Sequence, residues 1–154
     1  MLRGKTAIVT GGTRGIGLAI VRTFLQNGAK VALFGSRMET VDKALSALKA
    51  ENAAWPVIGL APDLTDYAAV AQALKDVHAA FGGLDILVNN AGISAREPLA
   101  EYRPEDFQKI MDLNVTAVFN ACKAAEPIMR AAGHGCIINT SSMVSLYGQP
   151  SGVG

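Results

Sequence analysis

Short, continuous runs of apolar residues alternate along the chain with longer stretches in which apolar residues recur every three or four positions. Five of the short runs predict strands buried on both faces: 6–10, 30–34, 55–60, 84–88 and 135–140. The intervening stretches have the spacing of amphipathic helices, beginning near Ile16, at 39–50, after Asp66 and near Pro104. This alternation predicts an α/β protein whose parallel sheet is covered by helices on both faces.

Right-handed crossovers leave few ways to arrange such strands. We expect a Rossmann-like, doubly wound parallel sheet with strand order 3-2-1-4-5, formed as one domain by residues 1–154. The fifth strand would then be an exposed sheet edge, which proteins usually cover. We therefore expect the sheet to be truncated after strand five, with a further C-terminal part or a partner covering that edge.

Local signals refine the helices. Asn27-Gly28 predicts a left-handed end to the first helix, whose expected buried stripe is Ile16, Ile20, Phe24 and Leu25. Asp66 predicts the N-cap of the third helix. The last helix is expected to run from Pro104 toward Met129, with Pro127 kinking it or shortening its final turns.

Composition narrows the classes of protein. Half of the residues are apolar, 18% are charged and the net charge is +1, which excludes a disordered tail and gives no sign of a nucleic-acid or membrane partner. Met1–Lys5 lead into a strand without a signal-peptide core, so we expect a cytoplasmic protein. Cys122 and Cys136 are expected to be buried free thiols, and His78 and His134 suggest no metal site.

A glycine-rich turn follows the first strand, and the next helix begins in it. The turn reads Thr-Gly-Gly-Thr-Arg-Gly-Ile-Gly over 10–17, a spacing of GxxxGxG. Glycines allow the backbone to approach a pyrophosphate, and the helix N-terminus offers unpaired N–H groups, although a tight turn alone would also favour glycine. We expect cofactor contacts from Gly11, Thr13, Arg14, Gly15, Ile16 and Gly17.

The segment after the second strand bears on the choice of cofactor. It reads Gly35-Ser36-Arg37 and lacks the acidic residue that binds the ribose hydroxyls of NAD. Ser36 and Arg37, with Arg14, could instead hold the 2′-phosphate of NADP(H), which favours NADP(H) and leaves NAD(H) possible. The alternative is that both arginines are solvated surface residues.

Two further polar segments follow strands three and four. Asp63-Leu64 would place a carboxylate where it can accept from the adenine amino group; the alternative is that Asp63 caps the segment that follows. Asn89-Asn90-Ala91-Gly92 lies beside the expected crevice, and we assign Asn90, Ala91 and Gly92 to the cofactor site, with a plain turn as the alternative.

Two candidates for catalytic roles remain. Asn114 falls on the predicted buried stripe of the last helix with Phe107, Ile110, Met111 and Val118, where it is either a satisfied core amide or the anchor of a water in a proton relay. Thr140-Ser141-Ser142 lies at the end of the fifth strand beside the same crevice, where a serine hydroxyl could polarise a substrate carbonyl. No His–Asp pair accompanies it, so a serine hydrolase is not expected.

Taken in order along all 154 residues, these motifs resemble the short-chain dehydrogenase/reductase family, closest to its 3-oxoacyl-[acyl-carrier-protein] reductases of fatty acid biosynthesis. The resemblance implies TGxxxGxG at 10–17, an adenine contact at Asp63-Leu64, NNAG at 89–92, and catalytic Asn114 and Ser142. It also implies a homo-oligomer, specifically a tetramer. The catalytic Tyr, with a Lys four residues later, would lie beyond Gly154; Tyr147 lacks that Lys and is expected to be a loop aromatic.

The function expected from this resemblance is an NADP(H)-dependent oxidoreductase that reduces a ketone of a small molecule, such as a 3-oxoacyl thioester, or oxidises the matching secondary alcohol. Two alternatives stay open: an alcohol or sugar dehydrogenase of the same family, and a truncated dinucleotide-binding fragment without turnover. In a weaker variant of the second, another chain supplies the missing Tyr and Lys.

Overall fold

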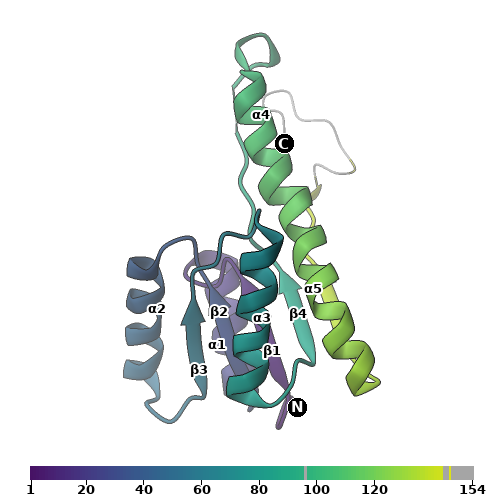
Figure 1. The fold of residues 1–154 in the computed structure, drawn as a ribbon. Coiled ribbons are helices and arrows are strands. Elements are labelled where there is room, and N and C mark those ends of the chain that lie inside the picture. Colours follow the sequence, from purple (N-terminus) through teal and green to yellow (C-terminus); the bar gives the residue numbers. More distant parts are fainter. Residues whose placement is uncertain (96, 144–145, 147–154) are drawn as a thin grey trace.

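The computed structural model describes residues 1–95, 97–143 and 146. Within that part, one sheet forms from β1 (Thr6–Thr10), β2 (Lys30–Phe34), β3 (Val57–Leu60), β4 (Ile86–Asn89) and β5 (Cys136–Asn139). All neighbouring strands are parallel, and their order is β3-β2-β1-β4-β5 (Figure 1). The predicted Rossmann-like order 3-2-1-4-5 is confirmed. The expected strands begin up to two residues too early at β3 and β4.

Helices connect the strands and cover the sheet. They are α1 (Gly15–Gln26), α2 (Met38–Glu51), α3 (Tyr67–Phe81), α4 (Pro104–Met111) and α5 (Ala117–Ala132). A short 3₁₀ turn (Leu99–Glu101) precedes α4, and a π-helical turn (Asp112–Thr116) joins α4 to α5. The long helix expected from Pro104 is therefore present as α4 and α5, which run continuously through the wider π-helical turn between them.

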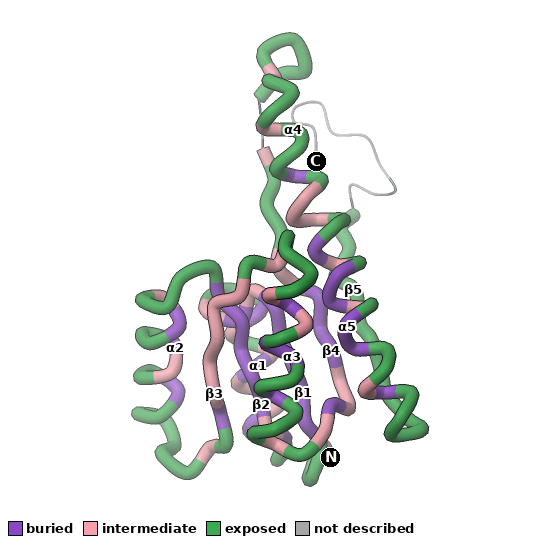
Figure 2. The backbone as a smooth tube through the Cα atoms, in the orientation of Figure 1, coloured by how far each residue is buried: buried purple, intermediate pink, exposed green. Residues whose placement is uncertain are grey.

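Apolar side chains on opposite faces of the strands form two core layers. One layer joins strand residues such as Val9 and Leu33 to α1 and α2, and the other joins Ile8 and Phe34 to α3 and α5. All five residues of β1 are buried, as expected for the central strand (Figure 2). Burying this apolar surface drives the assembly of the layers, and it fixes the strand ends that form the site.

Helix boundaries follow their local signals with one exception. Asp66 caps α3 as predicted, its carboxylate accepting from the Ala68 N–H at 2.9 Å, and Gly28 has the left-handed φ of +88°. Pro127, however, lies inside α5, which continues to Ala132, so the expected shortening is wrong, while the alternative of a kink stays a prediction. Its missing N–H would have bonded to the Lys123 carbonyl, and both residues are on the exposed side of the helix, where water can reach that carbonyl.

The expected buried stripe of α1 is shifted. Its fully buried residues are Gly17, Val21 and Leu25, whereas Ile16 is 69% exposed. Gly17 packs closely against the Gly11 carbonyl and the Asn90 side chain, and Ile16 instead lines the cleft described below.

In the last helix the expected stripe is only partly buried. Ile110 is 5% exposed, but Phe107 is 43% and Met111 is 36% exposed. The reason is geometric: α4 extends well beyond the sheet, so nothing in the described part of the chain covers most of it (Figures 1 and 2).

The edge strand β5 has all four residues exposed, including Ile137 at 40% and Ile138 at 45%. Cys136 lies on this strand and is exposed, and Cys122 in α5 is partly exposed. The expectation of two buried thiols is therefore wrong, because it was based on the apolar sequence around each cysteine, and in the described residues little covers the edge strand β5. Both thiols are free.

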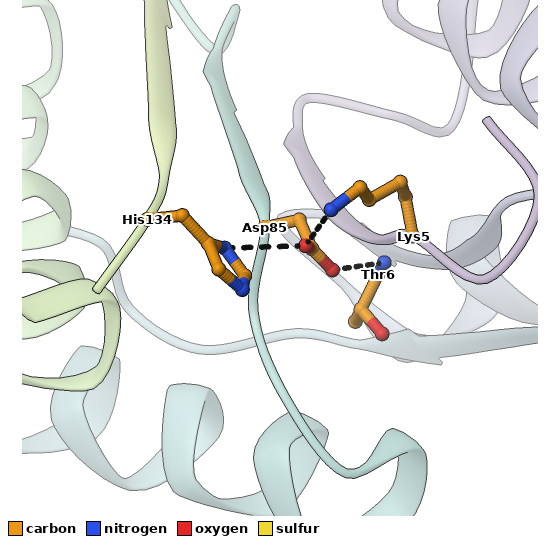
Figure 3. Close-up of polar contacts among 4 residues, drawn as sticks. All are labelled: Lys5, Thr6, Asp85 and His134. Atoms are coloured by element: carbon orange, nitrogen blue, oxygen red, sulfur yellow. Dashed lines mark hydrogen bonds and ion pairs between the residues drawn. The ribbon is translucent and has the colours of Figure 1, made fainter. Parts of the chain in front are cut away.

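At the N-terminal ends of the strands, Asp85 joins three strand beginnings (Figure 3). Its Oδ1 lies 2.8 Å from Lys5 Nζ and 3.4 Å from His134 Nδ1, and its Oδ2 accepts from the Thr6 N–H at 2.8 Å. Burial raises the pKa of Asp85, but the bonds from Lys5 and Thr6 and the neighbouring positive charge outweigh it, so its pKa is lowered overall.

The described residues contain neither a candidate membrane span nor a candidate metal site. No helix there combines the length and the apolarity needed to cross a bilayer. Nor do those residues contain a cluster of three or more His, Cys, Asp or Glu side chains arranged to hold a metal ion.

Candidate functional site

A cleft of about 620 Å³ opens at the C-terminal ends of the strands. Its lining includes all the residues predicted to contact a cofactor except Arg37: Gly11, Thr13, Arg14, Gly15, Ile16, Gly17, Ser36, Asp63, Leu64, Asn90, Ala91 and Gly92. These residues come from the loops after β1, β2, β3 and β4. The strand order brings four separate segments of sequence to one place, as expected at the switch point of a doubly wound sheet.

The glycine loop is shaped by close backbone contacts. Gly11 and Gly15 have positive φ values of 65° and 54°, a conformation that favours glycine. A Cβ at Gly17 would lie 2.1 Å from the Gly11 carbonyl oxygen, whereas a Cβ at Gly15 would meet nothing within 4 Å. Gly17 therefore allows the helix to close onto the loop, and Gly15 leaves room for a ligand.

The N-terminus of α1 suits an anionic group. The helix begins at Gly15, its N-cap Arg14 makes no side-chain capping bond, and its first turn contains no acidic residue. The first N–H groups of a helix lack partners within it and carry partial positive charge. The loop, the helix end and the size of the cleft together fit a dinucleotide with its pyrophosphate at α1.

Thr10 and Asn90 tie the loops after β1 and β4 together. The Thr10 hydroxyl accepts from the N–H groups of Asn90 and Ala91, each at 3.0 Å, and donates to the Val88 carbonyl at 3.4 Å. In return, the Asn90 side chain donates to the Thr10 carbonyl at 3.0 Å. Sequence reasoning did not assign Thr10 to the site, although a hydroxyl at the end of the central strand, directly before the glycines, was a usable signal.

Asp63 is held in a tight turn after β3. Its Oδ1 accepts from the N–H of Thr65 at 2.9 Å and from the Thr65 hydroxyl at 2.7 Å. These two bonds, the side-chain one first, lower the pKa of Asp63. Both bonds within the turn use Oδ1, so Oδ2 is left to accept from a ligand. Asp63 can therefore cap the turn and contact the cofactor at the same time, and the two sequence interpretations are compatible. Thr65 was not predicted as part of the site.

The residues after β2 are only partly brought to the cleft. Gly35 and Ser36 line it, and a Cβ at Gly35 would lie 2.6 Å from Thr13 Cγ2, so this glycine lets the two loops pack closely. Arg37 is the N-cap residue of α2, where its carbonyl accepts from the Thr40 hydroxyl at 2.8 Å. Arg14 thus lines the cleft, and Arg37 lies just outside its lining.

Asn114 makes two bonds with the backbone of one residue. In the π-helical turn its Oδ1 accepts from the Ile93 N–H at 2.9 Å, and its Nδ2 donates to the Ile93 carbonyl at 2.8 Å. The residue is half-buried, not fully buried as expected. Its amide therefore fixes the segment after Gly92. The predicted role as a water anchor stays a prediction.

Ser142 follows the end of β5. The ladder between β4 and β5 extends one residue beyond the strand, where the Thr140 N–H donates to the Asn89 carbonyl at 2.9 Å. Asn89 Nδ2 also donates to Asn139 Oδ1 at 2.9 Å. Ser142 is exposed and, like Asn114, is not part of the cleft lining. Tyr147 lies outside the described residues.

The fold and the glycine loop at its switch point define a Rossmann-type, dinucleotide-binding protein. The chain belongs to the short-chain dehydrogenase family, whose model matches residues 5–154. It is 58% identical over its whole length to a 3alpha-hydroxysteroid dehydrogenase of Mediterraneibacter gnavus, of which it covers 62%. It is 38% identical over 97% of its length to a gluconate 5-dehydrogenase of Gluconobacter oxydans, of which it covers 57%.

Solved structures agree with this assignment. The crystal structure of a xylitol dehydrogenase with bound NAD⁺ has 32% identity and a TM-score of 0.90, with 97% of this chain and 57% of that chain covered. A metagenomic short-chain oxidoreductase in complex with NADP has 36% identity and a TM-score of 0.84, with 92% and 64% covered. The chain thus spans roughly three-fifths of the length of these proteins.

Proposed function

We propose that the protein carrying this chain transfers hydride between a nicotinamide dinucleotide and a small molecule, interconverting a secondary alcohol and a ketone. NADP(H) is the favoured cofactor and NAD(H) the second candidate. The observation that carries the proposal is the cleft at the switch point, which gathers the predicted cofactor residues from four loops. Dehydrogenases among the relatives support the reaction class.

Each part of the cleft has a proposed task. The glycine loop and the N-terminus of α1 bind the pyrophosphate, and Asp63 accepts from the adenine amino group. Arg14, with Ser36 and Arg37, binds the 2′-phosphate through charge-assisted hydrogen bonds. The bound cofactor supplies or accepts the hydride. Asn114 keeps the backbone at Ile93 in place beside the cofactor cleft.

The substrate is proposed from the relatives. The sequence resemblance suggested a 3-oxoacyl thioester, but the relatives described above act, by their names, on hydroxysteroids and gluconate and do not support that specificity. The relative with 58% identity makes a hydroxysteroid the first candidate substrate. Ser142 is the proposed partner of its carbonyl. A tetrameric assembly and a cytoplasmic location stay predictions from the sequence.

The test is to titrate the native protein with NADPH and NADH and then to measure turnover of a 3-hydroxysteroid, gluconate and a 3-oxoacyl thioester. We expect NADPH to bind more tightly. Arg14→Ala should weaken NADPH binding by about 10- to 100-fold, the value of one or two charge-assisted bonds, and NADH binding far less. Arg22→Ala is the control, because Arg22 pairs with Glu51 on the surface at 2.8 Å.

Three results would contradict parts of the proposal. Equal binding of NADH would remove the assigned role of the arginines. Tight binding without turnover of any substrate would favour the alternative of a dinucleotide-binding protein without catalysis. Failure to bind either dinucleotide would reject the cofactor site itself.

A further inference from the structure

Asn120 is one of the few polar side chains in the core, and neither the motifs nor the proposed chemistry includes it. It lies in α5, is 5% exposed, and is surrounded by buried alanines of the same helix. A buried amide of this kind costs free energy unless it is hydrogen-bonded. The hydrogen-bond partners of the Asn120 amide therefore indicate its role.

Both partners lie in the loop after β3. Asn120 Nδ2 donates to the Leu64 carbonyl at 3.1 Å and to the Thr65 carbonyl at 3.1 Å. These carbonyls belong to the turn that Asp63 forms with Thr65. The internal bonds of that turn fix its shape, but they do not fix where it lies relative to the rest of the protein. The bonds to Asn120 do that, because α5 is packed against the sheet.

A second contact from α5 reaches the same region. Lys123, one turn after Asn120, places its ammonium group 4.8 Å from the ring centre of Tyr67, the first residue of α3. A cation over an aromatic face is an attractive pair. Helix α5 therefore holds the β3–α3 connection at two successive points, on either side of the Asp66 cap.

The held turn forms one wall of the cofactor cleft. Asp63 and Leu64 both line the cleft, and Asp63 is the proposed acceptor for the adenine amino group. We propose that Asn120 is a positioning residue for the adenine end of the cofactor: it acts through the Leu64 and Thr65 carbonyls to set the place of the Asp63 carboxylate. This inference rests on the proposed function and adds to it a residue outside the cleft.

The test compares the preferred dinucleotide with its deamino analogue, in which the adenine amino group is replaced by an oxygen. The native protein should bind the amino form about 10- to 100-fold more tightly, the value of one hydrogen bond to a charged group. In Asn120→Ala this preference should fall to about twofold or less, because Asp63 is no longer held in place. Asp63→Ala should lose the preference too, and the double variant should lose no more than either single variant.

Met129→Ala is the matched control. Met129 is also buried in α5, at 8% exposure, but it packs at the far end of the helix beside Gly135. It should lower thermal stability and leave the preference unchanged. If Asn120→Ala does not fold, Asn120→Leu, which keeps the branched outline of the side chain but removes its amide, takes its place.

The results separate the two proposals. An unchanged preference in a folded Asn120 variant would overturn the inference, as would an equal loss of affinity for both dinucleotides, which indicates general damage. A native protein that binds both analogues equally would also overturn it. A native protein that binds neither dinucleotide would reject the proposed function, and the inference with it.

Discussion

At the scale of single residues, the Thr10 hydroxyl makes three hydrogen bonds beside the cleft. The residue is 3% exposed, and its hydroxyl accepts two backbone N–H groups and donates to a backbone carbonyl. These bonds link the end of the central strand to the loop after β4. A hydroxyl can do this because it is both a donor and an acceptor, which no apolar side chain of similar size can be.

Thr10→Val should therefore destabilise the protein although it keeps the shape of the side chain. Two N–H groups would lose their acceptor, and we expect the free energy of unfolding to fall by about 1–3 kcal/mol. Denaturant unfolding measures this change. Thr10→Ser keeps the hydroxyl and should cost less, so an equal loss in both variants would show that packing, not hydrogen bonding, explains the effect.

At the scale of elements, the site depends on how closely α1 approaches the glycine loop. Only a residue without Cβ at position 17 allows that approach, since the added atom would also lie 2.6 Å from Asn90 Nδ2. The helix and the loops after β1 and β4 are thus packed as one unit. Moving α1 would move the N–H groups proposed to bind the pyrophosphate.

Gly17→Ala is expected to cost about 1–3 kcal/mol of stability, because overpacking against backbone cannot be relieved by a side-chain rotation. Cofactor binding should weaken with it, measured by titration at a temperature where the variant is folded. Gly83→Ala is the control: a Cβ there meets nothing within 4 Å, and both stability and binding should be unchanged. Intact binding in a folded Gly17→Ala protein would contradict this account.

Most elements, and most of the cleft, could be predicted because their causes are local. Apolar runs, helical spacing and glycine positions can be read directly from the sequence, and the strand order follows from the rules of chain connectivity. Ile16, Met111 and Cys136 were all expected to be buried and are exposed, for one reason. Burial depends on which elements cover a face of a helix or strand, and the spacing of apolar residues along the sequence does not contain that information. Asn120 was missed for a related reason, because its partners lie 55 and 56 residues away.

At the scale of the whole molecule, the sheet is tied at both of its ends. The Thr10 and Asn90 bonds join the C-terminal ends of β1 and β4, and Asp85 joins the N-terminal beginnings of β1, β4 and β5 (Figure 3). The carboxylate is 14% exposed, so solvent screens its interactions only partly. Its charge state should therefore affect the stability of the whole sheet.

Because the pKa of Asp85 is lower in the folded protein than in the unfolded chain, its contribution is present above the unfolded pKa of about 3.9. It is lost as the pH falls through the folded pKa. Asp85→Asn should thus lower the free energy of unfolding at pH 7, and the difference from the native protein should shrink below about pH 4.

Denaturant unfolding across this pH range is the measurement, with Asp42→Asn, an exposed carboxylate of α2, as a control expected to show little change. A difference between native protein and Asp85→Asn that does not vary with pH would show that the ionised carboxylate is not the source.

The central place of β1 has a consequence for how the chain folds. β1 is the first of the five strands along the chain, and one of its neighbours, β2, follows after a single helix. The other neighbour, β4, arrives much later: Lys5 and Asp85 are 80 residues apart. Closing so long a loop costs entropy before the pairing repays it, so the β1–β4 pairing should form late. Until then β1, all five of whose residues are buried in the folded protein, has one open edge, and the growing chain is most prone to aggregate in that interval.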